Sequence, residues 1–294
     1  MQNTITLKPG ALTLGDLARW RDSHDRFELD TACWTEIRAG AATVEAIVAK
    51  GAPAYGINTG FGKLANTHIP NDQLEELQKN IVLSHSAGVG KPLADRVVRL
   101  ILILKIASLA RGRSGVRPVI LESLLRLLNA GVYPLIPEKG SVGACGDLAP
   151  LAHMTSILLG LGEAHVGGKR MPAQDALRAA GLSPLTLAAK EGLALLNGTQ
   201  VSTALAIDGW IDIERCFAAA VVAGAMSVDA AMGSDTPFDD RIHQLRGQPG
   251  QIAVAAQYRA LLQQSEIRNS HLVGDDKVQD PYSLRCQPQV MGAC

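Results

Sequence analysis

The chain has 294 residues, of which 47% are hydrophobic, so it is long enough to bury a substantial core in one large domain or two smaller ones. Its 28 lysine and arginine residues are balanced by 28 aspartate and glutamate residues, which leaves no basic excess to neutralise phosphates or an anionic membrane surface. The composition therefore argues against nucleic acid and membranes as partners.

The first ten residues lack the basic stretch, apolar run and small-residue cleavage site of a secretory signal, so we expect a cytoplasmic protein. The uncharged stretches 100–104 and 216–228 are shorter than the roughly 20 residues that a membrane-spanning helix needs. We interpret both stretches as buried core helices.

Apolar residues recur at spacings of three and four over much of the chain, a pattern typical of helices. Glycine closes three of these patterns, which predicts helices over residues 34–50, 96–111 and 118–130 with caps at Gly51, Gly112 and Gly131. Residues 200–231 are rich in alanine and predict one long helix or two stacked end to end. The fold class that follows is mainly α.

Strand patterns are confined to residues 4–7 and to residues 164–171, where Gly167 and Gly168 predict the turn of a small hairpin. Loops give way to long helices near residue 200, which predicts an N-terminal domain over 1–198 and the beginning of a helical bundle over 199–294. Residues 287–294 carry no cap, charged last turn or polar tail, so we expect the chain to be a truncated portion of a longer protein.

The five cysteines form no CxxC pair and the seven histidines form no HxH or HExxH group. The odd number and wide spacing of the cysteines fit a reducing compartment. The sequence therefore predicts no metal site.

Residues 138–154 contain the segment with the most chemical information, EKGSVGACGDLAPLAHM. Its local pattern predicts a glycine-rich turn that feeds a helix, with Asp147 as the N-cap and Pro150 tolerated in the first turn. A phosphate-binding loop is disfavoured because the GxxxxGK[ST] lysine is absent.

The same segment resembles the GSVGASGDLAPLAH signature of the aromatic amino acid ammonia-lyases, with Cys145 in place of the family's serine. Other segments are similar to that family in the same order: PAYGINTGFG at 53–62, LSHSAG at 83–88, LLNGTQ at 195–200 and KVQDPYSLRCQPQVMGA at 277–293. The segments at 83–88 and 277–293 are closest to the family's histidine branch.

The resemblance implies that Ala144, Cys145 and Gly146 form a protein-derived cofactor, 4-methylidene-imidazol-5-one, without a metal or a dissociable cofactor. Ring closure requires the amide nitrogen of Gly146 to attack the carbonyl carbon of Ala144, and only glycine leaves room for that approach. Loss of water and of the Cys145 side-chain heteroatom would then leave the methylidene carbon. By the same resemblance Asp147 orients this turn.

The resemblance also implies roles for two residues near the ring. Tyr55 would be the catalytic base, whereas an arbitrary tyrosine at such a position would be a loop aromatic packed on the surface. Asn197 would donate a hydrogen bond to negative charge on the ring oxygen. An N-cap role for Asn197 before Gly198 and Thr199 is the alternative, and both can hold together.

Substrate binding is implied for a second group of residues. Arg285 would bind the substrate carboxylate in a bidentate pair, beside Gln279 and Tyr282, with Tyr282 counted among the catalytic residues. His85 would select the substrate by hydrogen bonding to its imidazole. Without this resemblance, the interpretation of Arg285 would be a solvated surface charge, and that of His85 a polar side chain whose hydrogen bonds are made within the protein.

The activity that the resemblance implies is non-oxidative removal of ammonia from L-histidine to give trans-urocanate, in histidine degradation. It also implies a homotetramer for the full-length protein, with a loop-rich N-terminal domain and a long-helix bundle. The alternatives are a tyrosine or phenylalanine ammonia-lyase, an aminomutase of the same family, and a catalytically inert fragment.

Overall fold

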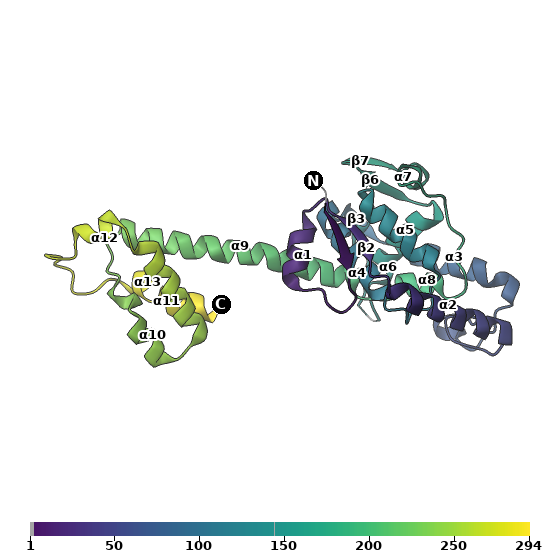
Figure 1. The fold of residues 1–294 in the computed structure, drawn as a ribbon, viewed down its shortest axis with the longest axis horizontal. Coiled ribbons are helices and arrows are strands. Elements are labelled where there is room, and N and C mark those ends of the chain that lie inside the picture. The colour runs from purple at the N-terminus through teal and green to yellow at the C-terminus, as the bar shows by residue number, and fades with distance from the viewer. Residues whose placement is uncertain (1–2, 144) are drawn as a thin grey trace. The chain divides into compact units, whose positions relative to one another are not determined.

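The computed structural model describes residues 3–143 and 145–294 of the chain, which divide into two compact units. The first unit is Met1–Gly209 and the second is Trp210–Cys294; each is described by itself below, with its elements labelled in Figure 1. Helices predominate in both, as the sequence predicts. Among the described residues, no helix is both long enough and apolar enough to cross a membrane.

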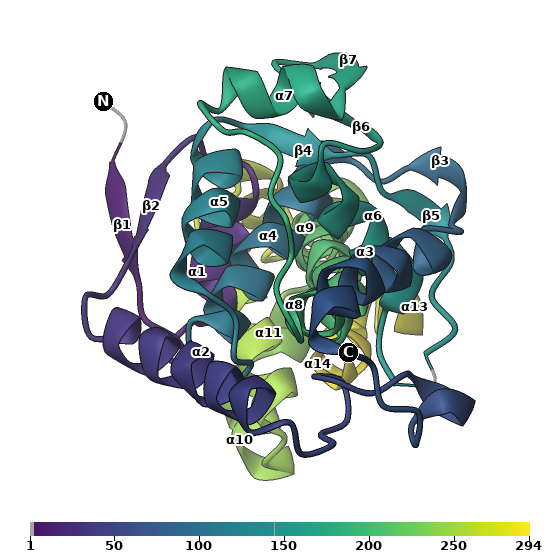
Figure 2. The same cartoon turned by 90° about the vertical axis from the view of Figure 1, so that its right-hand side faces the viewer.

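Two buried helices form the centre of the first unit (Figure 2). In α4 (Asp95–Leu109) and α5 (Pro118–Asn129), most apolar side chains are buried. Helix α4 carries them on nearly every face, whereas α5 exposes Glu122 and Arg126 on one face. Around them lie α1 (Leu14–Arg21), α2 (Cys33–Lys50), α3 (Leu74–His85), α6 (Leu148–Ser156), α7 (Ala173–Ala179) and α8 (Glu191–Leu196), with the short 3-10 helices η1 (Gly62–Leu64), η2 (Asn71–Gln73) and η3 (Ile157–Leu159).

The predicted helices are confirmed, with small differences at their ends. Helix α2 ends at Lys50 and is capped by Gly51, which adopts the left-handed conformation (φ 71°), and α5 is followed by Gly131 (φ 63°). Helix α4 ends at Leu109, two residues before the predicted limit, because Arg111 and Gly112 turn back onto the carbonyls of Ser108 and Leu109.

The strands are more numerous than the sequence pattern predicts. The expected strand β1 (Thr4–Leu7) and the hairpin of β6 (Glu163–Val166) and β7 (Lys169–Pro172) are confirmed. The restriction of strands to those two places is wrong: β2 (Arg26–Leu29) pairs in parallel with β1, β3 (Val89–Pro92) pairs with β5 (Pro137–Lys139), and β4 (Val132–Pro134) pairs with β6. These strands have three or four residues and pair over long sequence separations, so they show no alternation in the sequence.

Helix α9 (Gln200–Ala230) is one continuous helix, so of the two alternatives the single helix is confirmed. The interpretation of residues 216–228 as buried is wrong: within this range only Val221, Ala225 and Val228, on one face of the helix, are buried, and most of the others are exposed. The division between the two units falls between Gly209 and Trp210, inside this helix. The domain boundary near residue 198 stays a prediction.

The second unit has its own core, formed mainly by α9 and α11 (Pro249–Leu262). Phe238 and Tyr258 are fully buried there, with ring centroids 4.9 Å apart. The remaining elements are η4 (Thr236–Phe238), α10 (Asp240–Arg246), α12 (Glu266–Ser270), α13 (Tyr282–Arg285) and α14 (Gln287–Ala293). Helix α14 packs on α11, which fixes the segment that follows the predicted substrate-binding residues.

Candidate active site

Helices α3, α6 and α8 pack against one another in the first unit. His85 is the last residue of α3, Asp147 directly precedes α6, and Asn197 directly follows α8. The packing of these three helices therefore brings together the segments that carry those residues.

The predicted ring-forming turn is pressed against the backbone of Gly198. Ala144 lies outside the described residues, Cys145 is exposed, and Gly146 is buried with φ 127°. A Cβ atom at Gly146 would lie 2.6 Å from the carbonyl oxygen of Gly198 and 2.9 Å from its nitrogen. The backbone N–H of Asp147 donates to the same carbonyl at 2.8 Å. Only glycine fits position 146 without moving the neighbouring segment.

The carboxylate of Asp147 is buried and makes three hydrogen bonds. Oδ1 accepts from Ser141 Oγ at 2.8 Å, while Oδ2 accepts from the backbone N–H of Ser202 at 2.8 Å and from its Oγ at 3.0 Å. The predicted side-chain cap on α6 is therefore wrong, since the carboxylate satisfies an N–H in the first turn of α9 instead. A local pattern cannot show this, because Ser202 is 55 residues away.

Asn197 is the C-cap of α8, and α9 begins three residues later at Gln200, so the N-cap alternative is wrong. Its backbone N–H donates to Leu193 at 2.9 Å, and its carbonyl accepts from Lys105 Nζ at 2.8 Å. Its side chain is exposed, and within the part of the chain that the structure describes its amide makes no hydrogen bond. The amide is thus available to an external acceptor.

Lys105 is a residue of this region that the sequence analysis missed. It is 1% exposed, and burial lowers its pKa to about 7. The sequence signal was a single lysine in the apolar sequence LILILKIA of α4. Burying an amino group there costs free energy unless hydrogen bonds compensate, so the position was a candidate for a specific contact.

Tyr55 lies in the loop after α2, with 58% of its surface exposed. Its hydroxyl accepts from the backbone N–H of Gly62 at 3.5 Å, and its ring meets Phe61 edge-on at 6.2 Å. Buried Asn58 braces this loop by bonding to the backbone of Ala54 at 2.7 Å and of Ala52 at 3.0 Å. The phenol is therefore accessible on a loop that internal hydrogen bonds hold.

The same loop approaches α8, the helix that Asn197 ends. A Cβ atom at Gly56 would lie 2.3 Å from Cδ2 of Leu193. The loop that carries Tyr55 therefore packs next to the helix that leads to Asn197.

His85 is half-buried, and its Nδ1 lies 2.8 Å from the carbonyl of Ile81. Because a carbonyl can only accept, Nδ1 donates this hydrogen bond, and Nε2 is the ring nitrogen left for a ligand.

The turn after His85 is attached to α6 at two points. Ser86 Oγ lies 3.0 Å from Ser156 Oγ, and the N–H of Gly88 donates to His153 Nε2 at 3.0 Å. Burial lowers the pKa of His153, which keeps this nitrogen unprotonated and able to accept. The turn after α3 is thereby fixed to the helix that follows Asp147.

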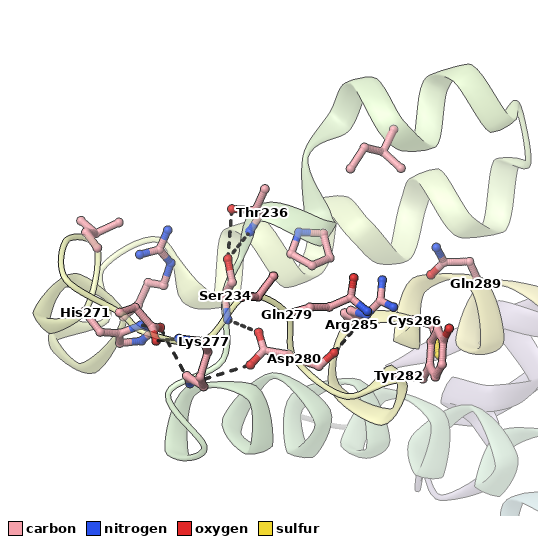
Figure 3. A pocket seen from close by; sticks show the side chains of 16 residues that line it. Ser234, Thr236, His271, Lys277, Gln279, Asp280, Tyr282, Arg285, Cys286 and Gln289 are labelled. Atoms are coloured by element: carbon pink, nitrogen blue, oxygen red, sulfur yellow. Dashed lines mark hydrogen bonds and ion pairs between the residues drawn. The ribbon is translucent and has the colours of Figure 1, made fainter.

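The predicted carboxylate-binding residues line a pocket of about 660 Å³ in the second unit (Figure 3). The Arg285 guanidinium stacks over the Tyr282 ring at 4.6 Å, and its Nε donates to the carbonyl of Asp280 at 3.0 Å. Its two terminal nitrogens have no partner among the described residues. Gln279 and Tyr282 line the same pocket with exposed side chains.

Asp280 fixes the backbone of this pocket. It is 7% exposed, and its Oδ2 accepts from the N–H of Ser234 at 2.7 Å. This bond ties the segment before α13 to the residues that follow α9, so that Arg285 projects from a braced turn.

The predicted site residues are thus divided between the two units: Tyr55, His85, Cys145, Gly146, Asp147 and Asn197 belong to the first, and Gln279, Tyr282 and Arg285 to the second. Among the described residues, no group of three histidine, cysteine, aspartate or glutamate side chains is placed to hold a metal ion.

The chain is 64% identical over 290 residues to a histidine ammonia-lyase of Aromatoleum aromaticum, a match that covers 99% of this chain and 55% of that protein. It is similar to the crystal structure of histidine ammonia-lyase from Trypanosoma cruzi (TM-score 0.87, 38% identity, 99% of this chain and 54% of that chain). It is also similar to the phenylalanine aminomutase of Pantoea agglomerans (TM-score 0.88, 30% identity, 99% and 59%). The chain spans about half the length of the curated relatives it matches.

The family profile described as aromatic amino acid lyase matches residues 12–294, nearly the whole chain. The matched range includes the packed segments of α3, α6 and α8 and the pocket around Arg285. The chain therefore belongs to the aromatic amino acid lyase family.

Proposed function

We propose that the full-length protein containing this chain removes ammonia from L-histidine without oxidation and releases trans-urocanate. The observation that carries the proposal is the 64% identity, over 290 residues, to the histidine ammonia-lyase of A. aromaticum. The substrate, the activity and a homotetrameric assembly belong to the whole protein, and all three are part of the proposal. A cytoplasmic location is proposed with them.

The residues around the turn fit the methylidene-imidazolone group that we propose for Ala144, Cys145 and Gly146. The fit rests on Gly146, where the backbone of Gly198 leaves no room for a Cβ, and on the Asp147 carboxylate, which ties the turn to α9. Once formed, this group would supply an electrophilic carbon for the amine of the substrate. Asp147 would hold the turn in the compressed geometry that ring closure needs.

Asn197 and Tyr55 are proposed as the catalytic side chains of the first unit. The Asn197 amide, unpaired among the described residues, would donate to negative charge that develops during the reaction. The Tyr55 oxygen is accessible to solvent and, as the phenolate, would accept the proton from the β-carbon of the substrate and become the hydroxyl.

Substrate recognition is proposed for Arg285 and His85. The two terminal nitrogens of Arg285 match the two oxygens of a carboxylate, with Gln279 and Tyr282 beside them. The Nε2 atom of His85 would accept a hydrogen bond from the imidazole N–H of the substrate, which a phenyl ring cannot offer.

The experiment compares the full-length protein with its Cys145→Ser variant, which restores the family's serine. Each is incubated with L-histidine, L-phenylalanine and L-tyrosine, and ammonia and the unsaturated acid are measured together. We expect turnover of histidine above the other two substrates. A preference for phenylalanine or tyrosine would contradict the proposal and indicate a phenylalanine or tyrosine ammonia-lyase. A β-amino acid as product would indicate an aminomutase.

Maturation is followed in the same samples by the mass of the peptide spanning residues 140–153. In the natural protein we expect one population short of one water and one hydrogen sulfide, beside a population with a free thiol. Sulfur is a competent leaving group but a larger atom than oxygen, so it slows closure of the turn. If Cys145→Ser matures and deaminates histidine while the natural protein does neither, the Cys145 form is inert.

A further inference from the structure

Lys105 is a buried residue of α4, and its amino group points at the end of another helix. Nζ donates to the carbonyl of Ala194 at 2.9 Å and to the carbonyl of Asn197 at 2.8 Å. The side chain thus links the core of the first unit to the end of α8.

These two carbonyls need donors that the helix itself cannot provide. Helix α8 has only six residues, and the last carbonyls of any helix lack partners within it. No acidic side chain pairs with Lys105 among the described residues, and burial lowers its pKa to about 7. An uncharged amine has two N–H groups, and the two carbonyls match them. The contact therefore costs less than burying an unpaired ammonium would.

The carbonyl of Asn197 lies immediately before the residue that touches the ring-forming turn. Gly198 follows Asn197, and its carbonyl accepts the N–H of Asp147 at 2.8 Å. The peptide that carries the Asn197 side chain is consequently held on one side by Lys105 and on the other by the turn at residues 146–147.

We propose that Lys105 is a positioning residue for the reaction: by holding the end of α8, it fixes the Asn197 amide relative to the turn at Gly146. The inference rests on the role of Asn197 stated in the proposed function. Lys105 itself does not touch the substrate, since its amino group is enclosed in the core.

The test replaces Lys105 by methionine, which keeps most of the volume and removes both donors. In the full-length protein, Lys105→Met is expected to lower kcat by roughly 10- to 100-fold with KM changed less than about 3-fold, since a displaced catalytic group costs this much. Asn197→Ala alone is expected to lower kcat by roughly 100- to 1000-fold. In the Asn197→Ala background, Lys105→Met should cost less than about 2-fold more, because its effect passes through Asn197.

Lys190→Met is the matched control. Lys190 lies at the other end of α8, is partly buried and donates to a carbonyl, that of Ser114 at 2.8 Å, but it does not contact Asn197. We expect it to change kcat by less than about 3-fold. Lys105→Arg keeps donors for both carbonyls and should recover most of the turnover lost in Lys105→Met.

Hydrogen exchange gives a readout that is independent of activity. Lys105→Met should speed exchange at the amides of Asn197 and Asp147 at least 10-fold, whereas Lys105→Arg and Lys190→Met should leave these amides close to the natural rate. If Lys105→Met does not fold, Lys105→Gln replaces it in both measurements.

Two results would overturn the inference. One is an equal loss of kcat from Lys105→Met with and without the Asn197 side chain, and the other is unchanged exchange at Asn197 and Asp147. If Asn197→Ala leaves turnover of histidine unchanged, the proposed role of Asn197 fails, and the inference about catalysis falls with it. If exchange in Lys105→Met is nevertheless faster, Lys105 holds the end of α8 but contributes only to the stability of the fold.

Discussion

Replacing Gly146 by alanine tests the close approach of two backbone segments at the centre of the candidate site. The new Cβ would lie 2.6 Å from the carbonyl oxygen of Gly198, whereas ordinary contacts begin near 3.4 Å. The segments would have to separate by about 0.8 Å. That shift stretches the 2.8 Å hydrogen bond from the N–H of Asp147 to Gly198 beyond bonding range.

Two costs follow from this geometry. Alanine in the backbone conformation of Gly146 (φ 127°) is strained by about 1–3 kcal/mol. A buried N–H left without its acceptor costs about 1–3 kcal/mol more. We therefore expect Gly146→Ala to lower the free energy of unfolding by about 2–6 kcal/mol.

Gly143→Ala is the matched control from the same turn. Gly143 also has a left-handed backbone (φ 66°), but nothing lies within 4 Å of the position that its Cβ would take. Its replacement should cost only about 1–2 kcal/mol of conformational strain. The difference between the two variants isolates the contact with Gly198.

The assay is urea denaturation of the natural protein and both variants, with the mass of the peptide spanning residues 140–153 measured in parallel. We expect Gly146→Ala to have the lower midpoint and to retain an unclosed turn, while Gly143→Ala still matures. Equal midpoints for the two variants would refute the argument from close packing against Gly198.

Three further outcomes follow from the geometry. His85→Leu should lower kcat/KM for histidine at least 10-fold more than for phenylalanine, since the acceptor at Nε2 is lost and an apolar surface replaces it. Equal losses of kcat/KM for the two amino acids would show that His85 has a structural role only. Arg285→Lys should raise KM for histidine by roughly 10-fold or more, because a lysine cannot form the bidentate pair; steady-state kinetics with an unchanged KM would exclude the carboxylate contact. Burial lowers the pKa of Lys105 to about 7, below its value of about 10.4 in the unfolded chain. Between these two pH values the unfolded chain binds more protons than the folded protein, so the free energy of unfolding rises with pH by up to about 1.4 kcal/mol per pH unit. Urea denaturation at pH 7, 8 and 9 should show this gain in the natural protein relative to Lys105→Met, and a constant difference would contradict it.

Local sequence patterns were sufficient for helices α2, α4, α5 and α9 and for the hairpin. The glycines after α2 and α5 end helices, and Gly167 and Gly168 form a hairpin turn. Both effects depend on a few neighbouring residues, so they can be predicted from the sequence. The short strands β2 to β5 were missed because three or four residues carry no period, and their pairing partners are distant in the chain.

The candidate residues could be named from the sequence, because the motifs at 53–62, 83–88, 138–154, 195–200 and 277–293 carry the family resemblance residue by residue. The sequence could not determine what holds those residues in place. The Asp147 carboxylate caps α9 across 55 residues, and Lys105 reaches Asn197 across 92. Such contacts depend on which buried donor meets which unsatisfied carbonyl or carboxylate once the helices have packed, and only the tertiary structure decides that.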